Sequence, residues 1–139
     1  SDGYVRLSAN SGGIQFNGDT AAANALDDYE EGTWTPVIEG TSTTGTGTYP
    51  IQSGRYTNVG NKVLPTARNS WTAHTGTGSI FISGLPFSVS EFSGFSVRTG
   101  NGLTVGANKT YVDQTTNKLV IEATITGTGD IILGAQYRS

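Results

Sequence analysis

The chain has no cysteine and no methionine, and it contains a single histidine, His74, among its 139 residues. Without cysteine it forms no disulfide bonds, no thiolate metal sites and no thiol nucleophile. A Ser-His-Asp triad would need His74, which lies in a Gly/Thr segment with no nucleophile-elbow motif nearby. No apolar run approaches the ~20 residues of a membrane-spanning helix. We therefore expect no metal, no cofactor, no catalytic residue and no membrane insertion.

Charge is also scarce, because charged residues make up 14% of the chain and the net charge is −3. Its distribution is uneven. Residues 1–40 contain seven acidic residues and one basic residue (−6), whereas residues 41–139 contain four acidic and seven basic residues (+3). The basic residues are scattered along the second segment and form no cluster in the sequence. We therefore expect no nucleic-acid partner.

Glycine and threonine dominate the composition, with 20 and 21 residues. This profile favours short strands and tight turns over helices, and only residues 20–31, which include an alanine-rich stretch, suit a helical turn or two. Alternating apolar residues predict strands at residues 49–57, 62–71, 79–83, 118–126 and 131–137, among eight or so in total. The fold class that follows is all-β, an antiparallel β-sandwich of jelly-roll-like type.

Two of these segments carry more detailed predictions. In residues 118–126 the inward side chains are Leu119, Ile121, Ala123 and Ile125. Residues 59–62 predict a tight hairpin turn in which Gly60 supplies the positive φ. Pro65 cannot donate a hydrogen bond to a ladder, so it places the strand at residues 62–71 at a sheet edge or on a bulge.

The most unusual stretch is residues 26–36, which packs four carboxylates, Asp27, Asp28, Glu30 and Glu31, into five positions. A strand-like alternation follows in residues 33–39, with Trp34, Pro36 and Ile38 on one face. We interpret the stretch as the joint between a stalk, residues 1–25, and a head domain, residues 26–139, with Trp34 as its structural anchor. For the carboxylates, a solvated hinge or an inter-subunit ion pair is favoured over a metal site, and a metal site over catalysis.

The stalk has short strand-like pieces at residues 4–7 and 13–16 that bury almost nothing alone. Such a segment becomes ordered when identical copies wrap around one axis and share a core of Val5, Leu7, Ile14 and Phe16. The alternative is a disordered linker.

Residues 26–36, together with residues 11–20 and 54–63, resemble the C-terminal region of tail fibre and tailspike proteins of tailed bacteriophages. The resemblance spans about residues 11–87. It implies a homotrimer on the virion with a short intertwined β stalk. It also implies attachment to bacterial surface polysaccharide or lipopolysaccharide. The alternatives are a trimerisation cap without a ligand and an accessory domain of a polysaccharide depolymerase.

Three aromatic residues flank the polar loops at residues 41–48 and 73–78 and are the carbohydrate-binding candidates: Tyr49, Trp71 and His74. Sugars are bound by stacking on aromatic rings while small polar groups bond their hydroxyls. A position in the core or at the trimer interface is the alternative for Trp34, Tyr56 and Trp71. We favour the core for Trp34 and Tyr56 and the surface for Trp71 and His74.

Overall fold

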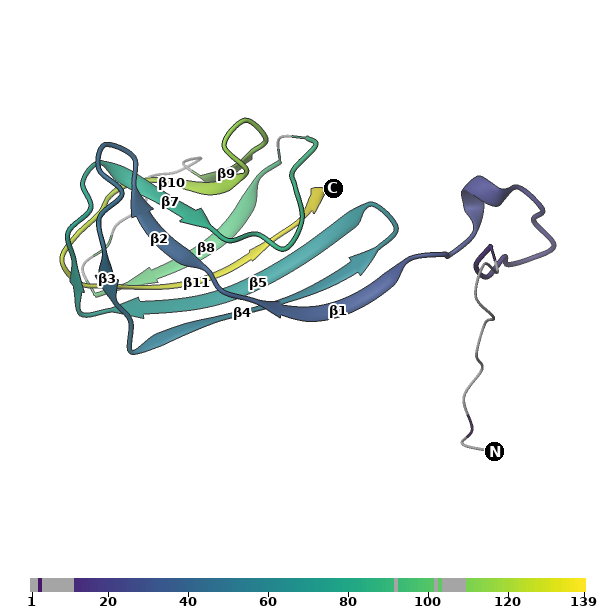
Figure 1. Ribbon diagram of the computed structural model, residues 1–139, viewed down its shortest axis with the longest axis horizontal. Coiled ribbons are helices and arrows are strands. Elements are labelled where there is room, and N and C mark those ends of the chain that lie inside the picture. The colour runs from purple at the N-terminus through teal and green to yellow at the C-terminus, as the bar shows by residue number, and fades with distance from the viewer. Residues whose placement is uncertain (1–2, 4–11, 92, 102, 104–109) are drawn as a thin grey trace.

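The computed structural model describes residue 3 and residues 12–91, 93–101, 103 and 110–139, and the strand predicted at residues 4–7 lies outside these ranges. The chain forms an antiparallel β-sandwich of two facing sheets (Figure 1), which confirms the predicted fold class. The first sheet has the order β1 (Tyr29–Trp34), β4 (Ile51–Val59), β5 (Lys62–Trp71), β11 (Gly129–Ala135), β8 (Phe95–Gly100), and β12 (Tyr137–Arg138) also pairs with β5. The second has the order β2 (Val37–Gly40), β7 (Ser79–Ser83), β10 (Lys118–Thr124), β9 (Thr110–Asp113).

The core lies between the two sheets and follows directly from the alternation along the strands. Strand β5 alternates between exposed and buried residues along its length, and its register with β4 and β11 continues the same inward face across the sheet. The predicted inward side chains of residues 118–126 are all buried, which confirms that prediction. They share the inward face of the second sheet with the fully buried isoleucines of β2 and β7, Ile38, Ile80 and Ile82.

The chain crosses from the first sheet to the second at Thr35–Pro36. Trp34, Pro36 and Ile38, which were predicted to lie on one face, are all buried, but the alternation belongs to two strands, because β1 ends at Trp34 and β2 begins at Val37. The carbonyl oxygen of Pro36 accepts hydrogen bonds from Asn69 Nδ2 at 2.8 Å and Gln52 Nε2 at 3.0 Å. Two side-chain amides of the first sheet therefore fix the crossing point.

Of the two alternatives predicted from Pro65, a sheet edge or a bulge, the sheet edge is wrong, because β5 is paired on both sides and Pro65 is fully buried. On one side Pro65 lies opposite Tyr56 of β4. On the other side the pairing with β11 ends at Thr66 and resumes with β12 at Val63. The missing N–H of proline is accommodated by this interruption, which lets an interior strand contain proline.

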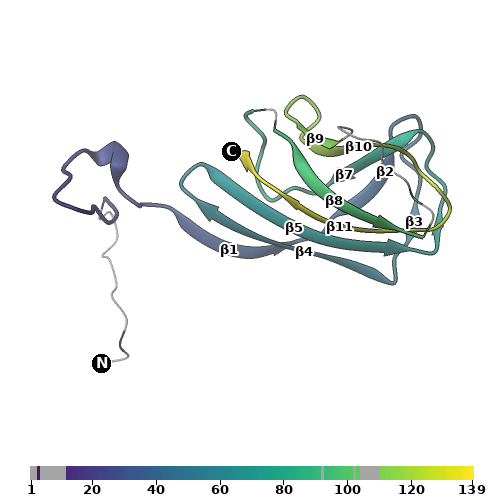
Figure 2. The ribbon, with the colours of Figure 1, turned by 180° about the vertical axis from the view of Figure 1, so that it is seen from behind.

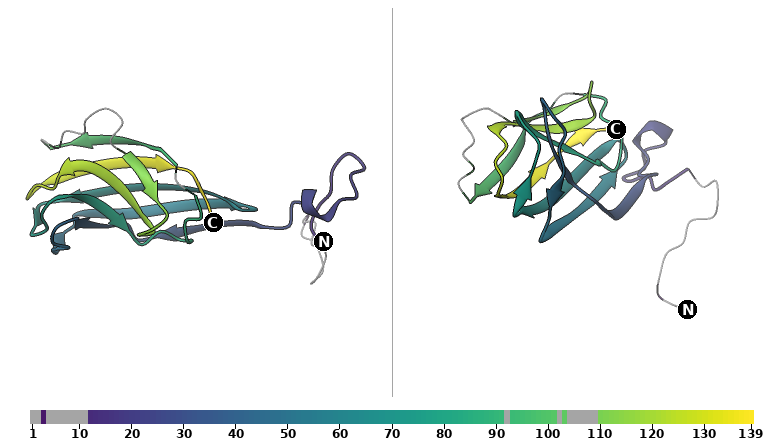
Figure 3. Two further views of the ribbon diagram at one scale, coloured as in Figure 1. Left: turned by 90° about the horizontal axis from the view of Figure 1, so that it is seen from above. Right: turned by 60° about the vertical axis from the view of Figure 1, so that its left-hand side comes forward.

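The β4–β5 hairpin turns as predicted, with Gly60 at φ 58°. The N-terminal segment leads away from the sandwich (Figures 1 and 3). Instead of a strand at residues 13–16 it contains an isolated bridge in which Ile14 and Leu26 exchange two backbone hydrogen bonds of 2.9 Å. The predicted helical turns reduce to a 3-10 helix, η1 (Ala22–Asn24). The division into stalk and head at residue 25 stays a prediction.

Both tryptophans pack over a glycine that lies directly opposite in the next strand. Trp34 pairs with Gly54, where a Cβ atom would lie 2.5 Å from the indole nitrogen. Trp71 pairs with Gly129, where a Cβ atom would lie 2.0 Å from Trp71 Cζ2. A residue other than glycine at position 54 or 129 would place its Cβ atom in the space that the indole of Trp34 or Trp71 occupies.

We expect Trp34→Ala and Trp71→Ala each to lower the free energy of unfolding by about 3–5 kcal/mol, the usual cost of truncating a buried aromatic residue. The melting temperature falls by roughly 2–4 °C per kcal/mol for a chain near this size. Thermal unfolding measures the effect, with Val59→Ala as the control because Val59 is 38% exposed. A variant at either tryptophan that melts with the wild type would contradict this packing.

Candidate functional site

The two polar loops that the carbohydrate-binding candidates flank lie side by side. Strand β3 (Gly47–Thr48) pairs with β6 (Ala73–His74), and Thr43 forms a bridge with Thr77. The Thr43 and Thr77 hydroxyls lie 2.9 Å apart, and the Thr46 amide donates to Thr75 Oγ1 at 2.9 Å. We call residues 41–48 and 73–78 the threonine rim. It lies at the end of the sandwich opposite the N-terminal segment (Figures 1 and 2).

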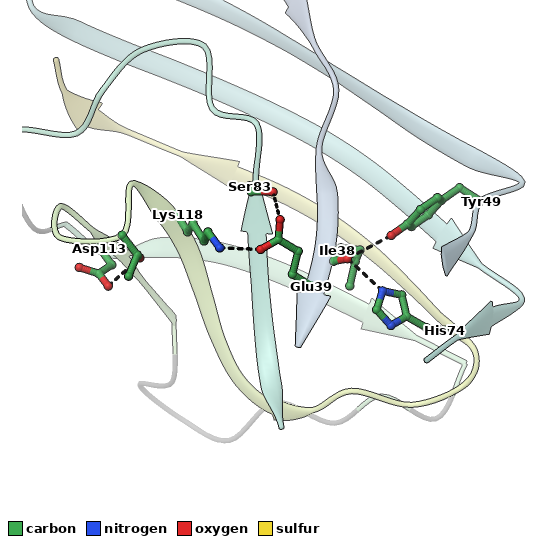
Figure 4. Close-up of polar contacts among 8 residues, drawn as sticks. Ile38, Glu39, Tyr49, His74, Ser83, Asp113 and Lys118 are labelled. Carbon is green, nitrogen blue, oxygen red and sulfur yellow. Dashed lines mark hydrogen bonds and ion pairs between the residues drawn. The ribbon is translucent and has the colours of Figure 1, made fainter. Parts of the chain in front are cut away.

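Tyr49 and His74 meet at the inner side of this rim, as Figure 4 shows. Tyr49 Oη donates to the carbonyl oxygen of Ile38 at 3.2 Å, and His74 Nε2 lies 2.9 Å from the same oxygen. The Gly76 amide donates to His74 Nδ1 at 2.9 Å, so the proton of the imidazole is on Nε2. Burial raises the pKa of Tyr49, which keeps its phenol protonated as a donor.

Gly47 makes this arrangement possible. A Cβ atom there would lie 2.6 Å from Tyr49 Cζ and 2.8 Å from His74 Cδ2. The backbone of Gly47 therefore contacts both rings. The structure brings Tyr49 and His74 together, and the polar atoms of both side chains form hydrogen bonds within the protein.

The expectation that Trp71 contacts ligand at the surface is wrong. Trp71 is 1% exposed, and its Nε1 donates to the Thr126 carbonyl oxygen at 2.9 Å. The polar loop that follows suggested a surface position. The alternation along the strand was the better signal, because Trp71 is separated by even numbers of residues from Val63 and Ala67 and therefore points inward with them. Trp34 lies where predicted, 7% exposed, with its Nε1 donating to the carbonyl oxygens of Arg55 and Thr66.

The acidic run is distributed along the edge of the first sheet. Asp28 Oδ2 accepts from Asn58 Nδ2 at 3.1 Å, Glu30 accepts from Tyr56 Oη, and Glu31 accepts from Tyr29 Oη. The bond to its carboxylate raises the pKa of each tyrosine. Within the described ranges no three His, Cys, Asp or Glu side chains are grouped to hold a metal ion, and no helix is long and apolar enough to span a membrane.

A second polar cluster, which the sequence did not indicate, lies on the outer face of the second sheet (Figure 4). Glu39 Oε2 lies 2.5 Å from Lys118 Nζ, and Ser83 Oγ donates to Glu39 Oε1 at 2.6 Å. Lys118 also lies 5.0 Å from the centre of the Phe81 ring. Burial raises the pKa of Glu39, but the hydrogen bonds from Lys118 and Ser83 and the lysine charge outweigh it, and the net pKa is lowered. The cluster ties β2, β7 and β10 together.

No protein-family model and no curated protein sequence matches this chain. Among solved structures, the chain is similar to the crystal structure of the Dettilon tailspike protein, with a TM-score of 0.57 and 14% sequence identity. The sandwich is similar in fold to part of a phage tailspike. The match covers 79% of this chain and 24% of the tailspike chain. It supports the tailspike resemblance at the level of the fold.

Glu39 gives a prediction with a defined sign. Because its folded-state pKa is lowered, the unfolded chain binds more protons below the ordinary value of 4.5, and the stability from Glu39 is lost as the pH falls through the lowered pKa. We expect Glu39→Gln to be less stable than the wild type at pH 7, with the difference shrinking as the pH falls below about 4.5.

Urea unfolding between pH 3 and pH 7 measures this difference. Glu91→Gln is the control, because Glu91 is exposed and its contact with Arg138 is 3.7 Å long. A difference between wild type and Glu39→Gln that does not change with pH would mean that the Lys118 ion pair does not stabilise the fold.

Proposed function

We propose that this chain is the host-attachment head of a phage tail fibre or tailspike. It acts on the virion as a homotrimer and binds bacterial surface polysaccharide or lipopolysaccharide. The observation that carries the proposal is that the two ends of the sandwich differ, in a fold that is similar to part of a tailspike. An N-terminal segment with exposed apolar side chains leaves one end, and a polar threonine rim closes the other. This is the arrangement expected of a fibre tip, with the shaft on one side and the cell on the other.

The N-terminal segment supports the homotrimer because its apolar side chains have little cover in a single chain. Ile14 is 41% exposed, Phe16 63%, Leu26 37% and Tyr29 60%. Fully burying one such side chain is worth about 1.5–3 kcal/mol. Three copies around one axis bury these side chains against each other.

The rim supports carbohydrate binding through its many small polar groups. Its exposed threonines offer hydroxyl donors and acceptors, and Tyr49 and His74 lie beneath them. The buried contact of Tyr49 and His74 with Ile38 favours a second candidate function, a trimerisation cap without a ligand, because it accounts for both residues structurally. We propose no enzymatic activity.

The homotrimer predicts a mass in solution of about three times 14.5 kDa at micromolar concentration. Light scattering measures it. We expect Ile14→Ser/Phe16→Ser, or deletion of residues 1–25, to shift the mass toward that of the monomer, because apolar contact between copies is removed. Val59→Ser is the matched control, since it replaces an exposed apolar residue of the sandwich. A wild-type protein that is a monomer contradicts the proposal.

Carbohydrate binding at the rim predicts weak binding per site, roughly millimolar, with avidity raised by about two to four powers of ten on a repetitive surface. The measurement is binding of labelled protein to a panel of immobilised bacterial polysaccharides and lipopolysaccharides. Thr43→Ala/Thr77→Ala should weaken it, and Thr115→Ala, in the β9–β10 turn, should not. If the rim variant binds as well as the wild type, the receptor site lies elsewhere on the chain. If the wild type binds no member of the panel, the second candidate function, a trimerisation cap without a ligand, is favoured.

A further inference from the structure

The basic residues gather on one face of the folded chain, although they are scattered in the sequence. Of the eight lysines and arginines, Arg6 and Lys109 lie outside the described ranges, which leaves six. Five of the six are exposed on the outer face of the first sheet: Arg55, Lys62, Arg68, Arg98 and Arg138. The acidic residues at outward strand positions of the same sheet are Glu31 in β1 and Asp130 in β11. This face therefore carries a net positive charge on a protein that is negative overall.

Strand register places three of the arginines close together. Ile132 of β11 is the direct partner of both Arg68 in β5 and Arg98 in β8, so the two arginines flank it (strands in Figure 2). Two strand spacings separate them by roughly 10 Å. Arg55 in β4 lies opposite Thr66 and is the diagonal neighbour of Arg68, roughly 7–8 Å away. We call Arg55, Arg68 and Arg98, with the intervening Leu64, Thr66 and Ile132, the arginine face.

Two shallow hollows on this face adjoin each other. One, of about 390 Å³, lies over β1, β4 and β5, and the other, of about 320 Å³, lies over β4, β5 and β11. Arg55 and Thr66 line both hollows. Leu64 and Ile132, which are 38% and 40% exposed, provide apolar surface beside the charges. The two hollows therefore place cationic, hydroxyl and apolar groups next to one another on this face.

Little of this positive charge is neutralised by the chain itself. Arg68 lies 3.4 Å from Asp130, but its side chain is 49% exposed, and such a pair is weak. Among the described residues, Arg55 and Arg98 have no carboxylate within 4.0 Å. Guanidinium groups bind carboxylates through two parallel hydrogen bonds, and adjacent apolar surface suits the C–H face of a sugar ring.

We propose that the arginine face binds an acidic polysaccharide, whose carboxylates pair with Arg55, Arg68 and Arg98 while its rings pack on Leu64 and Ile132. This proposal rests on the proposed function, carbohydrate binding, and specifies an anionic ligand at a second surface beside the rim.

A second copy of the chain is the competing occupant, because the N-terminal segment is acidic. Among the described residues, all carboxylates of this segment except that of Asp27 already accept hydrogen bonds within the same chain. Asp19 accepts from the Ala21 amide at 2.9 Å and from Asn24 Nδ2, and Asp28 accepts from Asn58. Glu30 and Glu31 accept from tyrosine hydroxyls. These contacts favour an acidic polymer from outside over a neighbouring copy.

The test uses the full chain, with immobilised polygalacturonate as the acidic polymer and dextran as the neutral one. We expect binding to polygalacturonate but not dextran, and a fall in affinity between about 0.01 and 0.15 M salt as the screening length drops from about 30 to 8 Å. Arg68→Gln/Arg98→Gln should weaken binding by at least about tenfold, because each substitution removes a charge-assisted hydrogen bond. Arg68→Lys/Arg98→Lys should bind more tightly than the glutamine variant but less tightly than the wild type, since lysine restores the charge without the paired N–H donors of the guanidinium group.

Lys118→Gln is the matched control, because it removes a charge from the other sheet and should leave binding unchanged. Circular dichroism and light scattering of each variant accompany the binding data. Equal binding to both polymers, or polygalacturonate binding that survives the double variant, overturns the arginine face while leaving carbohydrate binding by the chain intact. Loss of the oligomer in the double variant also overturns it, because the face would then be a contact between copies. A wild type that binds neither polymer but binds members of the polysaccharide panel overturns this inference alone.

Discussion

The arrangement of both sheets depends on one carbonyl group. Pro36 O accepts hydrogen bonds from Asn69 and Gln52 of the first sheet at the point where the chain crosses to the second. On the N-terminal side of the crossing, Trp34 closes β1 over Gly54. On the C-terminal side, Ile38 enters the core and offers its own carbonyl to Tyr49 and His74. The edge strand, the core and the rim are thus tied to one short segment.

This crossing leaves polar atoms inside the sandwich. The Oδ1 atoms of Asn58 and Asn69 are buried and have no hydrogen-bond partner among the described residues, although each side chain uses its Nδ2. A buried unpaired acceptor costs about 1–3 kcal/mol. The two amides hold the crossing segment and the entry to β1, where backbone carbonyl and carboxylate groups would otherwise lack donors. The unpaired Oδ1 atoms therefore lower the stability of the fold, while the Nδ2 hydrogen bonds of the same side chains fix the path of the chain.

Much of the fold follows from local pattern. The strands at residues 62–71 and 79–83 occupy their predicted limits, and the inward residues of β10 alternate as expected, because alternation is a property of neighbouring residues. The errors arose where the position of a residue depends on pairing between strands that are distant in the sequence. Pro65 lies in an interior strand because β11 and β12 leave a gap beside it, and Arg68 meets Arg98 only through Ile132 of a third strand. In the candidate site, the loops were predicted together with Tyr49 and His74, but Trp71 was misplaced because its polar flank was weighted above the alternation along its strand.

The N-terminal segment enters the sandwich through β1, which is paired to β4 along all six of its residues. The ladder hydrogen bonds of an antiparallel pair lie perpendicular to the strands. When the segment is pulled away from the rim, the force therefore acts along β1 and across all of these bonds at once. Such shear loading distributes tension over the whole ladder, whereas pulling on a strand from its side would open one bond after another. A head that is held by its rim and pulled by its N-terminal segment is thus joined in the mechanically stronger of the two geometries.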